Sequence, residues 1–156
     1  MKRDPGELDV SRVDPMTESA QAERARAHHV LVIDDEPTIR VALRRFFSRM
    51  GWQVAEAADG NAALDVLLQP NEPVEERASR FDMVLSDIRM PGLNGMQLYD
   101  RLKEARPDIL PRLVFSTGDL AGTETAEFVR HSGCAVVQKP FMLEELREIA
   151  ERLAAS

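Results

Sequence analysis

The sequence predicts an α/β fold, a doubly wound sheet of five parallel strands with helices on both faces. Two observations lead to this fold class. From residue 29 onward, five short apolar runs alternate strictly with five longer amphipathic segments, which is the pattern of repeated strand–helix units. The short runs are also mostly apolar on both faces, as are parallel strands buried between two layers of helices. Connections between such strands are right-handed, so the order of the elements also predicts how the chain winds.

The five apolar runs are predicted to be the strands. They lie at 30–33, 52–55, 83–85, 113–115 and 135–137. Trp52 begins the second run and is expected to pack in the core, because a large aromatic ring buries much apolar surface. Val136, in the fifth run, is interpreted as another core residue.

The segments between the strands are predicted to be helices. Pro37 suits the first turn of the first helix, and Gly51 ends it. Further helices are expected at 60–68, at 95–105, at 121–132 and near the C-terminal end. The apolar residues at helical spacing are expected to face the sheet. They are Ile39, Leu43, Phe46, Phe47, Met50, Ala63, Leu64, Leu67, Leu68, Met96, Tyr99, Leu102, Ala126, Val129, Leu146, Ile149 and Leu153.

Two polar segments fall outside this pattern. Residues 1–28 contain few large apolar side chains and are predicted to be a tail or interdomain linker, because they cannot bury enough apolar surface to offset ordering. A short strand around 8–13 and a fraying helix at 18–27 are alternatives for parts of it. Residues 69–80 are predicted to be an exposed loop. The folded domain is therefore expected to span 29–156.

Composition narrows the classes of function. The formal net charge of −7 argues against a nucleic-acid partner, because surfaces that bind nucleic acids are normally basic. No apolar stretch approaches the roughly 18 residues needed to cross a membrane, and the first residues lack the apolar core of a signal peptide. Cys134 is the single cysteine, so no intrachain disulfide is possible and a reducing compartment is expected. We therefore expect a cytoplasmic protein that does not insert into a membrane.

Polar residues stand where four of the apolar runs end. Asp34 and Asp35 follow the first run, Asp87 the third, Thr117 the fourth and Lys139 the fifth. In an open parallel sheet, ligands bind outside the carboxyl ends of the strands, where the strand order reverses. Three carboxylates, a hydroxyl and an ammonium group at one such edge would make a site for a divalent cation and a phosphoryl group.

Each of these residues also has a simpler interpretation. Asp34 and Asp35 could cap the helix that begins at Pro37. Alternatively they could bind Mg²⁺, which prefers one or two carboxylates together with phosphate oxygens. Asp87 could be a turn residue or a carboxylate nucleophile that forms an aspartyl-phosphate. Lys139 could be a solvated surface charge or a point-charge clamp for phosphate.

Four segments carry a resemblance to a known family. They are Val-Leu-Val-Ile-Asp-Asp-Glu-Pro at 30–37, Asp-Met-Val-Leu-Ser-Asp-Ile-Arg-Met-Pro-Gly-Leu-Asn-Gly at 82–95, Val-Phe-Ser-Thr-Gly at 114–118 and Lys-Pro-Phe at 139–141. In this order they closely resemble the receiver domain of two-component response regulators, of the chemotaxis-regulator type, over about 29–154. The resemblance implies a flavodoxin-like sheet with strand order 2-1-3-4-5. It also implies a phosphoprotein of phosphorelay signal transduction, which catalyses only its own phosphorylation and dephosphorylation and is not an enzyme in the usual sense.

The resemblance also implies the roles of the site residues. Asp87 would accept a phosphoryl group from a phosphohistidine on a histidine kinase or histidine phosphotransfer protein, and would then signal to a downstream protein. Asp34, Asp35, Asp87 and the backbone carbonyl of Arg89 would bind Mg²⁺, with Mn²⁺ as an alternative. Lys139 would contact the phosphoryl group and precede a cis bond to Pro140.

The switch hydroxyl is a choice between Ser116 and Thr117, which strand alternation places on opposite faces. Thr117 is preferred, because receivers have a small residue directly after the switch hydroxyl and Gly118 fits that position. The sequence departs from the family at Val136, where many receivers carry a Tyr or Phe, and this puts the usual aromatic readout in doubt. Arg89 and Asp119 are expected to flank the route by which water reaches the phosphoryl group.

Several alternatives remain open from the sequence. The chain could be a stand-alone regulator, or the C-terminal receiver of a hybrid histidine kinase, which the polar segment at the start slightly favours. It could also be a degenerate receiver that only binds proteins, and failure to accept phosphate would indicate this. A different class of function is a Mg²⁺-dependent phosphohydrolase with an aspartate nucleophile. Such an enzyme would turn over an external phosphomonoester.

Overall fold

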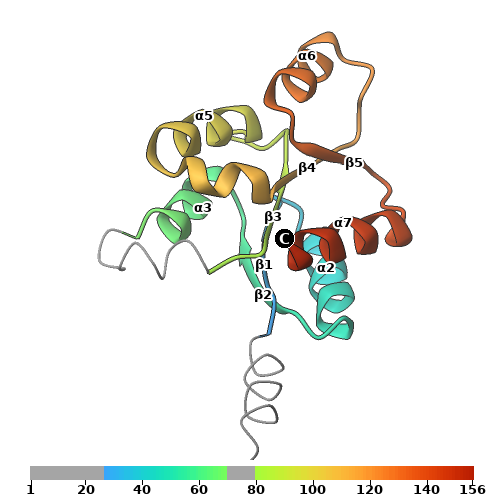
Figure 1. The fold of residues 1–156 in the computed structure, drawn as a ribbon. Helices are drawn as coiled ribbons and strands as arrows, with labels where there is room; N and C mark the ends of the chain where they lie inside the picture. Colours follow the sequence, from blue (N-terminus) through green and yellow to red (C-terminus); the bar gives the residue numbers. More distant parts are fainter. Residues whose placement is uncertain (1–26, 70–79) are drawn as a thin grey trace, which may run out of the picture.

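A five-stranded parallel sheet forms the centre of the molecule (Figure 1). The structure is a computed structural model that describes residues 27–69 and 80–156. The strands are β1 (His29–Ile33), β2 (Gln53–Ala57), β3 (Met83–Asp87), β4 (Leu113–Thr117) and β5 (Ala135–Gln138). They lie in the order β2-β1-β3-β4-β5, which confirms the predicted fold class and strand order.

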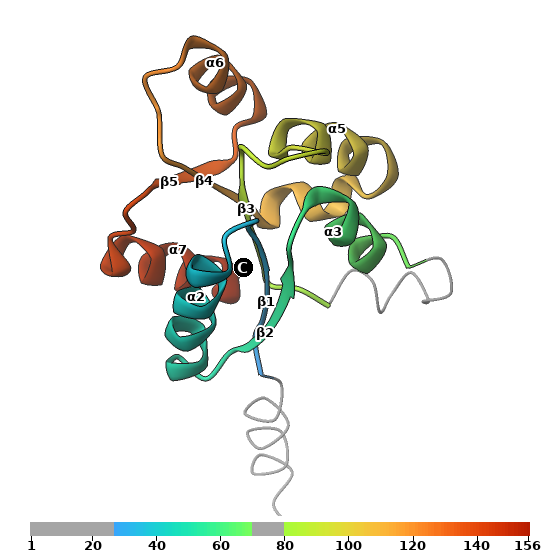
Figure 2. The ribbon, with the colours of Figure 1, turned by 180° about the vertical axis from the view of Figure 1, so that it is seen from behind.

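Helices cover both faces of the sheet, as Figures 1 and 2 show from opposite sides. They are α2 (Pro37–Arg49), α3 (Gly60–Leu67), α5 (Gly95–Ala105), α6 (Thr123–Ser132) and α7 (Leu143–Ala155). α2 and α7 pack on one face, and α3, α5 and α6 on the other. A 3₁₀ helix, η2 (Pro107–Arg112), lies between α5 and β4 and was not predicted.

Strand alternation divides the core into two clusters. In β1, Val30 and Val32 face α2 and α7, whereas Leu31 and Ile33 face the opposite layer. All four side chains are buried, as expected of a central parallel strand. Because β1 and β3 are packed on both faces, their carboxyl ends have fixed positions next to each other.

The predicted apolar helix positions lie toward these clusters, with two corrections. In α5 the buried residues include Leu98, which the sequence pattern omitted. In α6 the one buried residue is Thr125, whereas Ala126 and Val129 are only partly buried. The helix therefore rotates slightly from the predicted face.

The prediction for the second strand was wrong at its start. Trp52 precedes β2, because its N–H donates to the carbonyl of Phe47 at the end of α2 (3.0 Å) and not to the sheet ladder. Trp52 is nevertheless only 6 % exposed and belongs to the core, so the predicted packing role is confirmed. Gly51 ends the turn with φ of 85°, a conformation that glycine adopts without steric cost.

Predictions for the remaining segments fall largely outside the described residues. These are the tail at 1–28 with its alternative strand and helix, of which only residues 27 and 28 are described, and the loop at 69–80, of which only residues 69 and 80 are described. Among the helices of the described part, none is long and apolar enough to cross a bilayer.

Candidate metal and phosphoacceptor site

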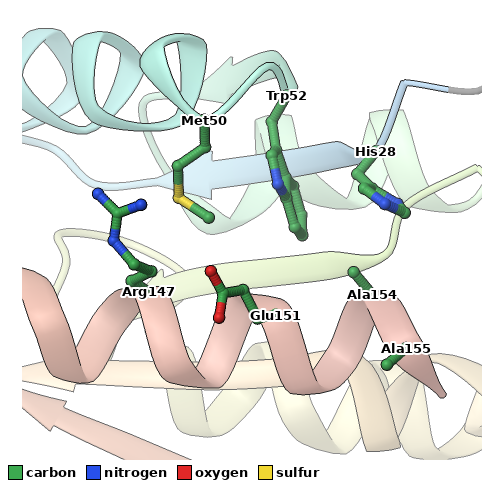
Figure 3. Close-up of a pocket in the computed structure, with 7 residues that line it drawn as sticks. All are labelled: His28, Met50, Trp52, Arg147, Glu151, Ala154 and Ala155. Atoms are coloured by element: carbon green, nitrogen blue, oxygen red, sulfur yellow. The ribbon is translucent and has the colours of Figure 1, made fainter. Parts of the chain in front are cut away.

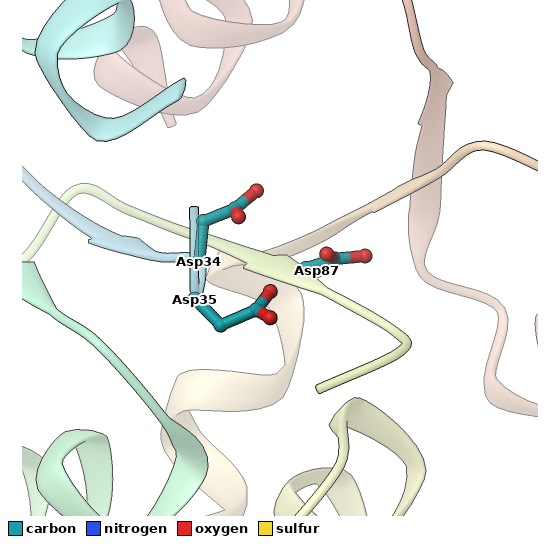
Figure 4. A group of neighbouring side chains, drawn as sticks. All are labelled: Asp34, Asp35 and Asp87. Atoms are coloured by element: carbon teal, nitrogen blue, oxygen red, sulfur yellow. The ribbon is translucent and has the colours of Figure 1, made fainter. Parts of the chain in front are cut away.

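Three carboxylates meet at the carboxyl edge of the sheet, where the strand order reverses (Figure 4). Asp34 and Asp35 follow β1 directly, and Asp87 is the last residue of the neighbouring strand β3. One ligand oxygen from each lies within 4.8 Å of the others. Asp34 and Asp87 are buried, whereas Asp35 is exposed, so the group opens to solvent on one side.

The turn after β1 holds Asp34 through its backbone and its side chain. The Asp34 N–H donates to the carbonyl of Ala57 on β2 (3.2 Å). Its carboxylate in turn accepts from the N–H of Glu36 (2.9 Å), the residue just before α2. Asp34 therefore fixes the direction in which the chain leaves the sheet.

A glycine allows the backbone around Asp87 to pack closely. The N–H of Gly95, the first residue of α5, donates to the carbonyl of Ile88 (2.8 Å). A Cβ atom at Gly95 would lie 2.7 Å from the carbonyl oxygen of Asp87 and 2.8 Å from the Cα of Ile88, which is too close for any side chain. The loop between β3 and α5 is consequently held against the helix that follows it.

Lys139 joins the two buried carboxylates. Its Nζ lies 2.8 Å from Oδ2 of Asp34 and 3.1 Å from Oδ2 of Asp87. Its N–H donates to the carbonyl of Thr117 (2.8 Å), which ties the residue after β5 to the end of β4. The Lys139–Pro140 peptide bond is cis, as the family resemblance implied.

The charges of this group shift two pKa values upward. Burial raises the pKa of Asp87 above its ordinary range, and Lys139 opposes the shift while Asp34 adds to it. For Lys139 burial acts to lower the pKa, but the two carboxylates together outweigh burial and hold the pKa above its ordinary value. The lysine is thus firmly protonated, and Asp87 is the acid whose ionisation the site opposes.

Residues 30–151 match the family described as the response regulator receiver domain. The chain belongs to this family. It is 32 % identical over 120 residues to the two-component response regulator ARR14 of Arabidopsis thaliana, covering 77 % of this chain but 29 % of that protein. It is 27 % identical over 123 residues to the sporulation initiation phosphotransferase F of Bacillus subtilis strain 168, covering 79 % of this chain and 90 % of that protein. This chain therefore spans less than a third of the plant relative.

A solved structure agrees with this assignment. The receiver domain of the Francisella response regulator 1452 has a TM-score of 0.64 and 28 % identity, covering 81 % of this chain and 95 % of that one.

The hydroxyl of Thr117 is engaged by the loop that follows β4. It accepts from the N–H of Asp119 (3.1 Å) and lies 3.3 Å from the carbonyl oxygen of the same residue. The register pairs Asp87 with Ser116, and register partners lie on the same face of a sheet. The register thus places Ser116, and not Thr117, on the face of Asp87 at the end of β4. The role of Thr117 as the switch hydroxyl stays a prediction, and it requires the hydroxyl to leave the backbone of Asp119.

Arg89 and Asp119 both point toward the start of α6. A Cβ atom at Gly122 would lie 3.4 Å from Nη2 of Arg89 and 3.6 Å from Oδ2 of Asp119, so the two charged ends flank one point. The N–H of Arg89 donates to Oδ1 of Asp87 (3.3 Å). The use of the Arg89 carbonyl as a metal ligand, and of the charged pair as a gate, stays predicted.

The donor set of the receiver suits a hard divalent cation. All side-chain donors in the acidic group are carboxylate oxygens, and Mg²⁺ binds such oxygens while keeping several waters. The exposed position of Asp35 leaves one side of the group open for those waters. Mn²⁺ also accepts carboxylate and water ligands, so the residues fit either ion.

The sequence analysis missed Arg40, which contacts the site, and Glu56, which contacts Arg40. Nη1 of Arg40, on α2, donates to the carbonyl of Asp34 (2.6 Å). Nε of Arg40 also lies 3.6 Å from Oε1 of Glu56 on β2. One signal was available: Arg40 is a cation in the first turn of a helix, where the helix dipole disfavours positive charge.

A separate hollow of about 420 Å³ lies at the amino ends of β1 and β2 (Figure 3). It is lined by His28, Met50, Trp52, Arg147, Glu151, Ala154 and Ala155. Because the acidic group is at the carboxyl ends of the strands, this hollow is not part of the candidate site.

Proposed function

We propose that this receiver accepts a phosphoryl group from a phosphohistidine onto Asp87, with Mg²⁺ bound, and changes conformation to signal to a partner protein. One observation carries the proposal: Asp34, Asp35, Asp87 and Lys139 converge from three strand ends on one point of the sheet edge. Two of the three carboxylates pair with the ammonium group of Lys139, and three carboxylates at this distance repel one another unless positive charge is supplied.

The transfer uses the carboxylate of Asp87 as nucleophile. One of its oxygens attacks the phosphorus, an oxygen–phosphorus bond forms, and the phosphorus–nitrogen bond to the donor histidine breaks. The electron pair of that bond leaves with the imidazole nitrogen. Positioning and charge neutralisation are the main demands of such a reaction. A Mg²⁺ ion held by Asp34, Asp35, Asp87 and the carbonyl of Arg89 would supply positive charge to the phosphoryl oxygens.

Lys139 changes partners in this proposal. In this structure its Nζ donates to the carboxylates of both Asp34 and Asp87. Once Asp87 is phosphorylated, Nζ follows the negative charge to a phosphoryl oxygen, a role that lysine performs as a point charge. The ammonium group therefore needs only a small movement to become the phosphate clamp.

The conformational change would begin at Thr117. Its hydroxyl leaves the backbone of Asp119 and donates to the phosphoryl group, and a hydrogen bond to a charged group stabilises by about 1.5–3 kcal/mol. The loop at 118–122 follows, together with α6. Val136 has neither ring nor hydroxyl, so we propose that the readout rests on this loop and helix.

Partner, boundary and location are part of the same proposal. The phosphodonor is a histidine kinase or histidine phosphotransfer protein, and the target is a further protein. The domain spans 29–156, preceded by a polar tail or linker at 1–28. Its negative net charge supports a function without nucleic acid, and a cytoplasmic location stays a prediction.

The test is intact-mass measurement after incubation with a small phosphodonor and Mg²⁺. The wild-type chain should gain one phosphoryl group, and Asp87→Ala should gain none. Asp100→Ala is the matched control, because Asp100 is an exposed carboxylate on α5 and its loss should change nothing. A phosphoryl group on Asp87→Ala would refute the assignment. Absence of phosphate on the wild type would indicate a degenerate receiver, and turnover of a phosphomonoester would indicate a phosphohydrolase.

A further inference from the structure

Arg40 reaches from the first turn of α2 back over the turn that carries the acidic pair. Its Nη1 donates to the carbonyl of Asp34 (2.6 Å), and its Nε lies 3.6 Å from Oε1 of Glu56. The other oxygen of Glu56 accepts from Nη1 of Arg44, one turn along the helix (3.0 Å). A chain of charged contacts thus runs from the surface of α2 and β2 to the backbone of Asp34.

The helix itself does not favour Arg40 at this place. The amino end of a helix repels positive charge, and the first turn of α2 itself contains no acidic residue, the nearest on the chain being the N-cap Glu36. Even so, the side chain of Arg40 is only 19 % exposed, compared with 50 % for Arg44. Its position is therefore set by the carbonyl of Asp34 and by Glu56.

We infer that Arg40 is a positioning residue for the metal site, an inference that rests on the proposed function. It holds the backbone of Asp34 so that the carboxylates of Asp34 and Asp35 face Asp87 before a cation arrives. Glu56 and Arg44 hold Arg40 in turn. Residues that orient metal ligands from outside the coordination sphere typically change metal affinity by 10–100-fold when they are replaced.

A second explanation predicts the opposite result. If Arg40 were merely a positive charge near the site, its removal would strengthen cation binding, because the cation would no longer be repelled. If it positions Asp34, its removal weakens binding. Lysine separates the two explanations: it keeps the charge, but one compact ammonium group cannot reproduce the guanidinium fork that reaches both the carbonyl and Glu56.

Variants at this position are expected to fold. Arg40, Arg44 and Glu56 line a hollow of about 420 Å³ at the surface, together with Pro37, Val41 and Ala58. A smaller side chain at position 40 would enlarge this hollow and admit water, so it would leave no sealed apolar cavity of the kind that destabilises cores.

The experiment measures Mg²⁺ binding by calorimetry for the wild type, Arg40→Gln and Arg40→Lys. Arg45→Gln is the control, because Arg45 is an exposed arginine of the same helix and its loss changes the net charge equally. We expect both Arg40 variants to bind Mg²⁺ roughly ten-fold more weakly and the control to bind as the wild type does. Tighter binding by Arg40→Gln with unchanged binding by Arg40→Lys would overturn the inference.

A second measurement needs no metal. The N–H of Glu36 donates to Asp34, so its hydrogen exchange in the metal-free protein reports on the order of this turn. Exchange should be faster in both Arg40 variants and unchanged in Arg45→Gln, and equal rates in all four proteins would overturn the inference. If the wild type binds no Mg²⁺, the proposed metal site and this inference are overturned together. If the wild type binds Mg²⁺ and both Arg40 variants bind it with the same affinity, the inference alone is overturned.

Discussion

Replacing Asp87 with asparagine should make the metal-free protein more stable at neutral pH. Asparagine has nearly the shape of aspartate but carries no charge. Asp87 is only 6 % exposed, and burial is the main reason that its pKa is raised. Asp87→Asn therefore removes a carboxylate whose ionised form the folded protein disfavours, while its amide oxygen can still accept from the N–H of Arg89.

The size of the effect follows from four contributions: three from charged neighbours and one from the removal of the charge from water. At a separation of up to 4.8 Å and an effective dielectric constant of about 20, Asp34 repels Asp87 by about 3–4 kcal/mol. Lys139, at 3.1 Å, attracts it by about 5 kcal/mol on the same basis. Exposed Asp35 adds a weaker, water-screened repulsion, so attraction and repulsion nearly cancel. The cost of removing the charge from water remains, up to several kcal/mol for a fully buried ion, and we expect a gain of about 1–3 kcal/mol at this half-open site.

The gain should depend on pH in a defined direction. Because the pKa of Asp87 is higher in the folded than in the unfolded chain, the folded protein holds more protons above about pH 4. The contribution of Asp87 to the free energy of unfolding of the wild type therefore falls as the pH rises from about 4 through the raised pKa. The difference between Asp87→Asn and wild type should be absent below that window and complete above it.

Thermal unfolding across this pH range, without divalent cations, tests the reasoning. A gain of 1 kcal/mol corresponds to about 2–4 °C for a chain of this size. Asp100→Asn serves as the control, because it removes one exposed negative charge and should change the melting temperature little. A metal-free Asp87→Asn protein no more stable than wild type at neutral pH would show that the ion pair with Lys139 outweighs burial.

Three further results are expected. Wild-type protein should gain thermal stability in millimolar Mg²⁺ through mass action, whereas Asp35→Ala should gain almost none; equal gains would count against the acidic group as the metal site. Gly95→Ala should be destabilised by about 1–3 kcal/mol and phosphorylated more slowly, because its Cβ would press on the backbone of Asp87. Gly133→Asn is the control and should phosphorylate normally, because asparagine tolerates the φ of 68° at this position and a Cβ there would have nothing within 4 Å. Arg89→Asn and Asp119→Ala should both lose the phosphoryl group faster than wild type, and unchanged rates in both would reduce the pair to ordinary surface charge.

The fold and the acidic group could be predicted because both follow from local pattern and topology. Apolar runs reveal buried strands, and an open parallel sheet brings its carboxyl ends to one edge. The convergence of Asp34, Asp35, Asp87 and Lys139 could therefore be predicted without any knowledge of side-chain geometry. The start of β2 was missed for a different reason: whether Trp52 bonds to a strand or to the end of a helix depends on three-dimensional contacts.

Side-chain direction could not be predicted in the same way. Period-two alternation distinguishes Ser116 from Thr117, but it does not say which hydroxyl the following loop engages. Arg40 escaped notice because its partners are a backbone carbonyl and Glu56, a residue on another strand. Neither contact leaves a pattern in a single sequence, apart from the unfavourable place of a cation at the start of a helix.

The ion pair between Lys139 and Asp34 joins residues 105 positions apart in the chain, and this separation bears on how the protein is made. During synthesis the carboxylates of β1 and β3 emerge long before the lysine that follows β5, and they repel one another until it arrives. A nascent chain that ended before β5 would contain Asp87, the proposed phosphoacceptor, and its acidic neighbours but not Lys139. On the function proposed above, the set of groups that accepts a phosphoryl group would thus be complete only with the last part of the fold.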